Sequence, residues 1–315
     1  LVSKDRTAAI ATDGRYTTQI AEEVPDIQAA IERNVAVAML SKAADGHRVG
    51  FEADYVSVSL LEKLREACPD GVTLVPVSGV IEDIRLTKDN VELTRLTEAA
   101  ELSVRALDEL LGAGELRAGR TECEVAADLE YRMRVLGAER VSFDTIVASG
   151  PNSAKPHHGA GDRVIAERDL VTIDFGMHRL GFNSDMTRTF AIGEIGSLEH
   201  EIYEVTLAAQ LAGVTAAVPG AKLADVDKAC RDVIEDAGYG EYFVHSTGHG
   251  VGLDVHEAPS AAKTGEGTLA EGMTLTIEPG IYIPGKAGVR IEDTLIITAA
   301  APKVITDYTK DLTVL

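Results

Sequence analysis

Several features that mark particular classes of protein are missing from this sequence. The three cysteines, Cys68, Cys123 and Cys230, are far apart, odd in number and form no Cys-x-x-Cys pair. This pattern supports neither a zinc ribbon nor a disulfide framework. We therefore interpret the cysteines as reduced and structural, which favours a cytoplasmic protein. No apolar run approaches the roughly 18 residues that a membrane span requires, so we expect no membrane segment.

Basic side chains are also scarce. Lysine and arginine together number 30 against 51 acidic residues, which gives a net charge of −21. Nucleic-acid binding needs basic side chains to neutralise phosphates, so we expect no nucleic-acid partner. The glycine-rich stretch Gly248–Gly252 lacks both the Gly-x-Gly-x-x-Gly spacing and the lysine of a phosphate loop. No His-Glu-x-x-His helix occurs, so a single-zinc protease of that type is not indicated.

The chain has room for two domains. Residues 1–85 alternate strand-like and helical patterns, which predicts a small α/β domain. The first residue is Leu1, without an initiating methionine or a signal peptide, and a strand pattern starts at once. We therefore expect that the start of this domain is missing. The elements predicted within it are buried strands at Val35–Met39 and Val72–Pro76 and a helix at Tyr55–Ala67.

Residues 86–315 have a different character. Apolar residues at helical spacing, glycine stops and a Thr121-Glu-Cys-Glu capping box indicate long helices separated by strands. This predicts an α+β domain with helices packed on a mostly antiparallel sheet. The helices are expected at Lys88–Leu111, Thr121–Leu136, Leu198–Ala217 and Leu223–Ala237.

A first hairpin, Leu170–Phe190, carries two aspartates that we expect to face each other. We place its turn at Arg179–Leu180, and side chains alternate between the two faces of each strand. The pairs expected from this symmetry are Asp174 with Asp185 and Thr172 with Thr187. Directly opposed residues have Cβ atoms roughly 4.5–5.5 Å apart, where two carboxylates repel each other. A metal ion would supply the compensating charge in a small volume.

A second hairpin repeats this pattern around Gly285. The pairs expected there are Glu278 with Glu292 and Thr276 with Thr294. We interpret the two hairpins as a weak internal repeat in which each half presents an acid pair. The alternative is that these acids are solvated residues on edge strands, and the repetition of the same acid and threonine pattern argues against it.

Histidine is concentrated near a glycine-rich segment. Of eight histidines in the chain, His245, His249 and His256 fall within twelve residues, and glycines flank His249. A lone histidine is usually a satisfied core residue, but three beside two acid pairs favour a site. Four carboxylates and one imidazole form an oxygen-rich ligand set that suits manganese, with cobalt or zinc as alternatives. Their four negative charges balance two divalent cations.

Six segments of this sequence resemble the pita-bread metallopeptidases, within them most closely the prolidase and aminopeptidase P branch. The resemblance covers residues 85–315, and residues 1–85 resemble the end of that branch's amino-terminal creatinase/prolidase-like domain. The matching segments are Ile146–His157, Thr172–Gly176, Ser184–Phe190, Gly248–Glu257, Ile277–Gly280 and Val289–Thr294.

The resemblance implies a role for each candidate residue. Asp174 would bind one metal, Asp185 and Glu292 would bridge both, and His249 and Glu278 would bind the second. Glu278 would also take a proton from the attacking water. The remaining family positions are His157 and His256, which would contact the substrate and the tetrahedral intermediate, and His245, Tyr282 and Arg290, which would line the pocket.

The activity implied is metal-dependent hydrolysis of X–Pro peptide bonds, with a proline-containing di- or oligopeptide as substrate. We favour an Xaa-Pro dipeptidase, or prolidase. The first alternative is an Xaa-Pro aminopeptidase that acts on longer peptides. A non-catalytic metal-binding module of the same fold is the second, and the complete ligand set argues against it. By analogy with the family we also expect a homodimer.

Overall fold

The computed structural model describes residues 1–315 and divides into two compact units, residues 1–81 and 82–315. The first unit contains two pairs of parallel strands, β1 with β2 and β3 with β4, together with short helices. Its elements are β1 (Ile10–Thr12), the 3-10 helix η1 (Gly14–Tyr16), α1 (Thr17–Glu23), β2 (Ala29–Ile31), α2 (Val35–Leu40), β3 (Arg48–Glu52), α3 (Val58–Glu66) and β4 (Thr73–Val77). Helix α4 (Val80–Arg85) spans the boundary. This confirms the α/β character expected for this part of the chain.

One element of the first unit differs from its prediction. Val35–Met39, expected as a buried strand, lies in helix α2. A short apolar run has no periodicity that distinguishes a strand from a helix. Ala36, Ala38, Met39 and the following Leu40 are good helix formers, so the helix agrees with their preference. The strand expected at Val72–Pro76 is present as β4, and the helix expected at Tyr55–Ala67 is present as α3.

The second unit begins with two long helices, and the amino terminus of the second is capped as the sequence predicts, at Thr121. In α5 (Asn90–Gly112) the Asp89 side chain and Glu92 form a capping box, and in α6 (Glu122–Val135) Thr121 and Glu124 form another. Short strands follow, and then a second pair of helices, α7 (Ser197–Ala216) and α8 (Leu223–Asp236). All four predicted helices are therefore confirmed to within a few residues at each end. No helix is long and apolar enough to cross a membrane.

The strands of the second unit pair antiparallel throughout. Three of their sheets have the orders β10-β7-β6, β13-β16-β17 and β5-β8-β9, and β11-β12 and β14-β15 are two-stranded. The strands are β5 (Arg140–Val141), β6 (Ile146–Ser149), β7 (Leu170–Phe175), β8 (Met177–Arg179), β9 (Phe182–Asn183), β10 (Met186–Ala191), β11 (Gly248–Gly250), β12 (Glu257–Ala261), β13 (Thr274–Ile277), β14 (Gly280–Ile283), β15 (Ala287–Arg290), β16 (Asp293–Ile297) and β17 (Pro302–Val304). Two 3-10 helices, η2 (Gly150–Ala154) and η3 (Gly240–Tyr242), complete the unit.

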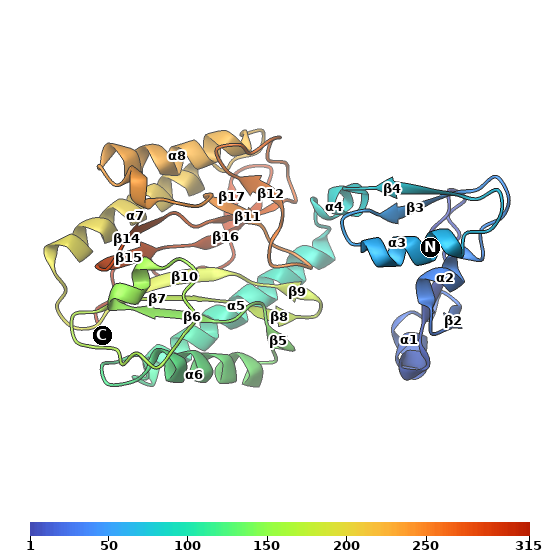
Figure 1. The fold of residues 1–315 in the computed structure, drawn as a ribbon. Coiled ribbons are helices and arrows are strands. Elements are labelled where there is room, and N and C mark those ends of the chain that lie inside the picture. Colours follow the sequence, from blue (N-terminus) through green and yellow to red (C-terminus); the bar gives the residue numbers. More distant parts are fainter. The chain divides into compact units, whose positions relative to one another are not determined.

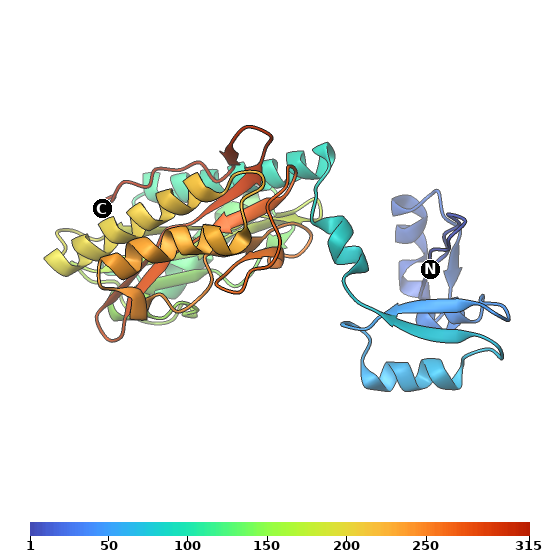
Figure 2. The same ribbon diagram turned by 90° about the horizontal axis from the view of Figure 1, so that it is seen from above.

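The helices cover the strands from two sides (Figures 1 and 2). Helices α7 and α8 pack with β13, β14, β15 and β16 in one hydrophobic core that contains Ile202, Ile234 and Ile277. Helices α5 and α6 pack with β6, β7 and β10 in a second core that contains Leu107 and Leu129. Because helices cover the strands of both hairpins, the side chains between the strands are shielded from water. The carboxylates of both hairpins therefore lie inside the protein.

The register of the first hairpin differs from the prediction by two residues. Asp174 lies opposite Thr187, and Thr172 lies opposite Thr189, so the expected pairs Asp174 with Asp185 and Thr172 with Thr187 are wrong. The turn is formed by Leu180 and Gly181, with φ of 50° and 85°. A two-residue hairpin turn favours positive φ at both central positions, which glycine adopts without strain, and Gly181 therefore sets the turn one residue later than expected.

The second hairpin has the predicted register. Thr276 lies opposite Thr294 in one ladder, and Ile283 lies opposite Ala287 next to the turn in the other. Both ladders are centred on Gly285, so Glu278 and Glu292 occupy matching positions in the interruption between them.

Candidate metal centre

The five predicted ligands come together in the second unit, at places where strand pairing is interrupted. Glu278 directly follows β13, Asp185 and Glu292 directly precede β10 and β16, and Asp174 and His249 lie within β7 and β11. Ligand atoms lie within 4.8 Å of one another in three sets, which are Asp174 with Asp185 and Glu292, His249 with Glu278 and Glu292, and Asp185 with His249 and His256. Asp185, Glu292 and His249 each belong to two sets. Of these three, only the two carboxylates have two oxygen atoms with which to bind two ions, so Asp185 and Glu292 are the candidates for shared ligands.

Two glycines allow the backbone to approach closely here. A Cβ atom on Gly176 would lie 1.8 Å from the carbonyl oxygen of Ser184, and one on Gly248 would lie 1.8 Å from that of Thr276. Both distances are far below van der Waals contact, so neither position accommodates a side chain without movement. Gly176 thereby sets the backbone path beside Asp185, and Gly248 that beside His249.

The His249 ring is oriented by its own backbone neighbour. Its Nδ1 lies 3.0 Å from the carbonyl oxygen of Gly250, which can only accept a hydrogen bond, so Nδ1 carries the proton. The Nε2 atom then points at the carboxylates, 3.2 Å from Glu278 and 3.6 Å from Asp185. This is the tautomer in which neutral histidine binds a metal through Nε2.

Threonine hydroxyls fix two of the carboxylates. Thr187 donates to Glu292 over 2.7 Å, and Thr276 donates to Glu278 over 3.0 Å. Two of the four threonines singled out in the sequence therefore bind carboxylates, and of the expected threonine pairs only Thr276 with Thr294 is present. These bonds restrict the rotation of both glutamates and prearrange their remaining oxygen atoms.

Burial and mutual repulsion strongly perturb the acids. Burial raises the pKa of Asp185 well above its ordinary value, and the charges of Glu292 and Asp174 raise it further. Burial and the charges of Glu278 and Asp174 likewise raise the pKa of Glu292 well above the ordinary value. Burial also raises the pKa of Asp174. These carboxylates are therefore costly to ionise together without cations among them.

Glu278 and His249 form an ion pair within this group. Burial would raise the pKa of Glu278, but the hydrogen bond and charge of His249 outweigh burial and lower it to about 2. The same bond raises the pKa of His249 to about 9 against the opposing effect of burial. A protonated histidine thus supplies part of the positive charge that the four carboxylates require.

The ligand set fits divalent metal ions. Four carboxylates gather in one place, and the main positive charges that act on them are those of Arg290 and His249. The Oδ1 atom of Asp174 is buried and has no hydrogen-bond partner. An unpaired buried carboxylate oxygen is rare and indicates a missing positive partner. Oxygen ligands with one imidazole are the donors that manganese and similar ions prefer.

Arg290, Tyr282 and His245 form a chain that leads away from Asp174. Arg290 donates to Asp174 over 2.7 Å and to the Tyr282 hydroxyl over 2.8 Å, and that hydroxyl lies 2.9 Å from Nε2 of His245. Burial lowers the pKa of His245, so its ring is neutral at pH 7. Nδ1 of His245 faces the carbonyl oxygen of Ser246 and carries the proton, so Nε2 accepts from Tyr282. All three predicted pocket residues are thus placed beside the acids.

The two remaining histidines lie at the exposed rim of the site. The ring centroid of His256 lies 4.3 Å from that of His249, and burial, followed by the charge of His249, lowers its pKa. His157 is exposed and makes no side-chain hydrogen bond. The loop that carries it is tied to the site, because the carbonyl oxygen of Pro156 accepts from Arg290 over 3.2 Å.

Two buried residues that sequence reasoning did not select support the site. Glu122 is fully buried and accepts from Ser149, Asn152 and Gly161 and also pairs with His158, so it anchors the loop before and after His157. Its only signal in the sequence is its place in the capping motif of α6.

Arg188 is the second of these residues, and its side chain is fully buried between the two hairpins. It pairs with Asp293 at 2.8 Å and donates to the carbonyl oxygen of Glu292. It also donates to the carbonyl oxygens of Thr306, Tyr308 and Thr309. A single arginine within a buried strand was the signal for this role.

Comparisons with known proteins agree with this arrangement. The model of metallopeptidase family M24 matches residues 94–299, and that of the creatinase/prolidase N-terminal domain matches residues 1–87. An Xaa-Pro dipeptidase of Pyrococcus furiosus is 43% identical over 257 residues, which cover 82% of this chain and 73% of that protein.

Two solved structures share the fold over nearly the whole chain. An Xaa-Pro dipeptidase from Bacillus anthracis has a TM-score of 0.92 and 41% identity, and the match covers 97% of this chain and 86% of that one. An X-Pro aminopeptidase from Thermotoga maritima has a TM-score of 0.90 and 36% identity, with 98% and 86% covered.

Proposed function

The chain belongs to metallopeptidase family M24, and from this premise we propose that it hydrolyses Xaa-Pro dipeptides as a prolidase. The observation that carries the proposal is the convergence of five ligand residues, with Asp185 and Glu292 each shared between two sets. Three relatives that are 40% to 46% identical to this chain over the aligned residues are named Xaa-Pro dipeptidases, which supports the same substrate class.

The metal centre we propose holds two divalent ions, with manganese as the preferred metal. Asp174 would bind one ion, His249 and Glu278 the other, and Asp185 and Glu292 both. When bound, such ions polarise the scissile carbonyl group and make a water molecule nucleophilic at neutral pH. Four carboxylates balance the charge of two divalent ions. A single divalent ion would leave two of the buried negative charges without compensation.

In this proposal Glu278 moves the proton. It accepts one from the attacking water and returns it to the proline nitrogen, which has no N–H and must be protonated as it leaves. The pKa of Glu278 near 2 depends on a protonated His249. A neutral His249 removes its charge from the causes that lower this pKa, so burial opposes fewer of them and the pKa of Glu278 rises toward the range of an effective base.

The histidines at the rim would act on the substrate. The lowered pKa of His256 keeps its ring neutral at pH 7, and its N–H would donate to the oxyanion that develops on the scissile carbonyl. His157 would contact the substrate from the facing loop. Arg290 and Tyr282, linked to Asp174, would fix the pocket wall, and His245 would hold the Tyr282 hydroxyl in place.

The activity test compares two peptides with added manganese. We expect rapid hydrolysis of Ala-Pro and little hydrolysis of Ala-Pro-Gly-Gly, because a dipeptidase encloses the free carboxylate of proline. Cleavage of the longer peptide alone would establish the second candidate, an Xaa-Pro aminopeptidase. The structural similarity to the Thermotoga maritima aminopeptidase is the observation that favours this alternative.

The same samples also test a non-catalytic role. Metal bound in stoichiometric amounts, with neither peptide cleaved, would identify a metal-binding protein that has kept the fold without the reaction. Parallel measurement of metal content separates that outcome from a protein that is inactive because it lacks metal.

We further propose that residues 1–85 form the creatinase/prolidase-like domain and residues 86–315 the catalytic domain. The compact units 1–81 and 82–315 support this division. A homodimer in the cytoplasm is proposed by analogy with the family and from the three free cysteines. Light scattering of the purified protein measures the oligomeric state directly.

A further inference from the structure

The segment that carries His256 has little structure of its own. It runs from Val251 to His256 between strands β11 and β12 and consists of turns and bends. The His256 side chain makes no hydrogen bond; its ring packs against that of His249, and one of its ring nitrogens lies within 4.8 Å of a carboxylate oxygen of Asp185. A side chain that must meet a developing charge requires a fixed position, so the support of this segment has to come from elsewhere.

Asn183 supports the start of the segment by donating to the carbonyl oxygens of Gly252 and Leu253. Nearer to His256, ion pairs on both sides of this residue supply the support. Nη2 of Arg85 lies 2.7 Å from Oδ2 of Asp254 and 2.5 Å from Oε2 of Glu257. Nζ of Lys88 lies 2.8 Å from Oε1 of Glu257. Both cations belong to the entry segment, residues 82–89, which precedes helix α5. Arg85 therefore bridges Asp254 and Glu257, which lie on either side of His256. Lys88 pairs with the other carboxylate oxygen of Glu257.

The exposed fractions of the paired side chains indicate which ion pair constrains the segment most. The side chains of Lys88 and Glu257 are 2% and 9% exposed, and that of Arg85 is 19% exposed. Separating buried charges leaves each one desolvated and unpaired, so their mutual geometry is strongly constrained. Asp254 is 59% exposed, and its pair with Arg85 is screened by water and contributes little. Glu257, the residue directly after His256, is thus the main point of attachment.

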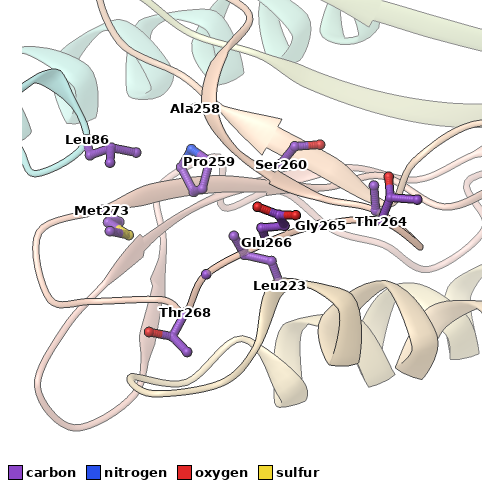
Figure 3. Close-up of a pocket in the computed structure, with 12 residues that line it drawn as sticks. Leu86, Leu223, Ala258, Pro259, Ser260, Thr264, Gly265, Glu266, Thr268 and Met273 are labelled. Carbon is purple, nitrogen blue, oxygen red and sulfur yellow. The ribbon is translucent and has the colours of Figure 1, made fainter. Parts of the chain in front are cut away.

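Hydrophobic packing does not replace these ion pairs between the entry segment and the residues that follow His256. A pocket of about 380 Å³ separates the entry segment from the strand that follows His256. Leu86 of the entry segment lines it together with Ala258 and Pro259 of strand β12 and with Met273 (Figure 3). Apolar side chains that border a hollow leave each other room to move. The charged contacts of Arg85 and Lys88 are therefore what ties His256 to the entry segment.

We propose that Arg85 and Lys88 are positioning residues for His256, acting through Glu257. They touch neither the substrate nor the metal ligands. They hold the backbone on both sides of His256, so that its ring stays beside His249 while the peptide reacts. The effect on turnover rests on the proposed peptidase function, whereas the effect on the loop does not.

The test uses full-length protein and four variants. Arg85→Ala removes the clamp, Arg85→Lys keeps a cation at the same place, and Glu257→Gln keeps the shape but removes the charge. Arg105→Ala is the matched control, since Arg105 pairs with Glu109 on the surface of α5 and is 63% exposed. The measurements are kcat and KM for Ala-Pro, manganese content, and hydrogen exchange of residues 251–258.

For Arg85→Ala we expect kcat to fall roughly 10- to 100-fold, because a small displacement of a group near the reacting atoms is costly. KM should change by less than about 3-fold, since the affected contact forms in the transition state. Manganese content should equal that of wild type. Exchange in residues 251–258 should be faster by about 10-fold or more. Arg85→Lys should recover much of the loss, and Glu257→Gln should resemble Arg85→Ala.

Equal kcat in Arg85→Ala and Arg105→Ala would overturn the proposal, and so would unchanged exchange in residues 251–258. Loss of manganese in Arg85→Ala would overturn it as well, because the effect would then lie in the metal centre. A wild-type protein that cleaves no X–Pro peptide would refute the proposed function. In that case faster exchange in Arg85→Ala alone would still support the positioning of the loop.

Discussion

Asp185 and Glu292 have the highest electrostatic cost of any residues in the site. Each side chain is almost fully buried, and burial and the charges of other carboxylates raise its pKa. A residue that destabilises the empty protein and belongs to two ligand sets is best explained by a function that requires its charge. Neutral variants of the same shape therefore separate the effect of each charge on stability from its effect on metal binding.

Asp185→Asn and Glu292→Gln should each lose at least one metal ion per chain and more than about 100-fold in activity, because a ligand charge is missing. Metal analysis after gel filtration, combined with a peptide assay, measures both quantities. Glu109→Gln, an exposed change on α5, is the control and should behave as wild type. A variant that keeps full activity while binding no metal would refute the metal centre.

The pKa shifts also predict how the metal-free protein responds to pH. Asp174, Asp185, Glu292 and His249 all have folded pKa values above their unfolded ones. Between these values the folded state binds more protons than the unfolded state, so stability falls as pH rises. The contribution of His249 is complete below its ordinary value of 6.5 and is lost as pH passes about 9.

We therefore expect the melting temperature of the metal-free protein to fall between about pH 5 and pH 9. With saturating manganese it should rise over the lower part of this range, because protons compete with the metal for the same ligands. Asp185→Asn should flatten the metal-free profile. Differential scanning calorimetry in both states provides the test, and a metal-free profile that rises toward pH 9 would contradict it.

At the scale of elements, the first hairpin contains a break in its strand pairing, next to Asp185. The ladder of β7 and β10 stops at Phe175 and Met186, and Gly176 then passes against the backbone of Ser184, directly before Asp185. This close approach fixes the backbone that places Asp185 beside Asp174 and Glu292. A methyl group at Gly176 would force the two strands apart at that point.

Gly176→Ala should destabilise the protein by about 1–3 kcal/mol through overpacking and should weaken metal binding by displacing Asp185. Gly112→Ala is a suitable control, since a Cβ there meets nothing within 4 Å. Chemical denaturation and a manganese titration measure the two effects. Unchanged metal affinity in a folded Gly176→Ala protein would show that the interruption does not position Asp185.

The sequence allowed the long helices and the second hairpin to be predicted, because capping boxes and a glycine turn are local signals. The first hairpin was placed two residues out of register, since the turn was assigned without regard to Gly181. The five candidate ligands did not depend on that register, because either pairing leaves both aspartates in the same hairpin.

Other parts of the site depend on contacts between distant segments and could not be predicted. Glu122 and Arg188 have partners 27 to 121 positions away in the chain. Nothing in their immediate neighbours shows those contacts. The prediction of a strand at Val35–Met39, which lies in helix α2, failed for a different reason. A short apolar run contains too little periodicity to identify its structure.

At the scale of the whole molecule, the net charge of −21 has a consequence for metal binding. A strongly negative protein attracts cations from solution and raises their rate of association. The Debye length shrinks from roughly 30 Å at 0.01 M salt to about 8 Å at 0.15 M, which confines this attraction to the vicinity of the protein.

We expect the rate of manganese loading into the metal-free protein to fall as sodium chloride is raised across that range. Stopped-flow measurement of recovered activity at constant manganese provides the rate. The dissociation rate should change much less, because the buried site is shielded from the added salt. A loading rate independent of salt would show that the overall charge plays no part.

The position of Arg188 has one further consequence, which concerns synthesis of the chain. Its guanidinium group is buried against carbonyl oxygens of Thr306, Tyr308 and Thr309, which leave the ribosome after all five candidate ligands. Until that segment emerges, a buried cation beside Glu292 lacks three of its acceptors. The hydrogen bonds that satisfy Arg188 beside Glu292 can therefore form only after all five candidate ligands have been synthesised.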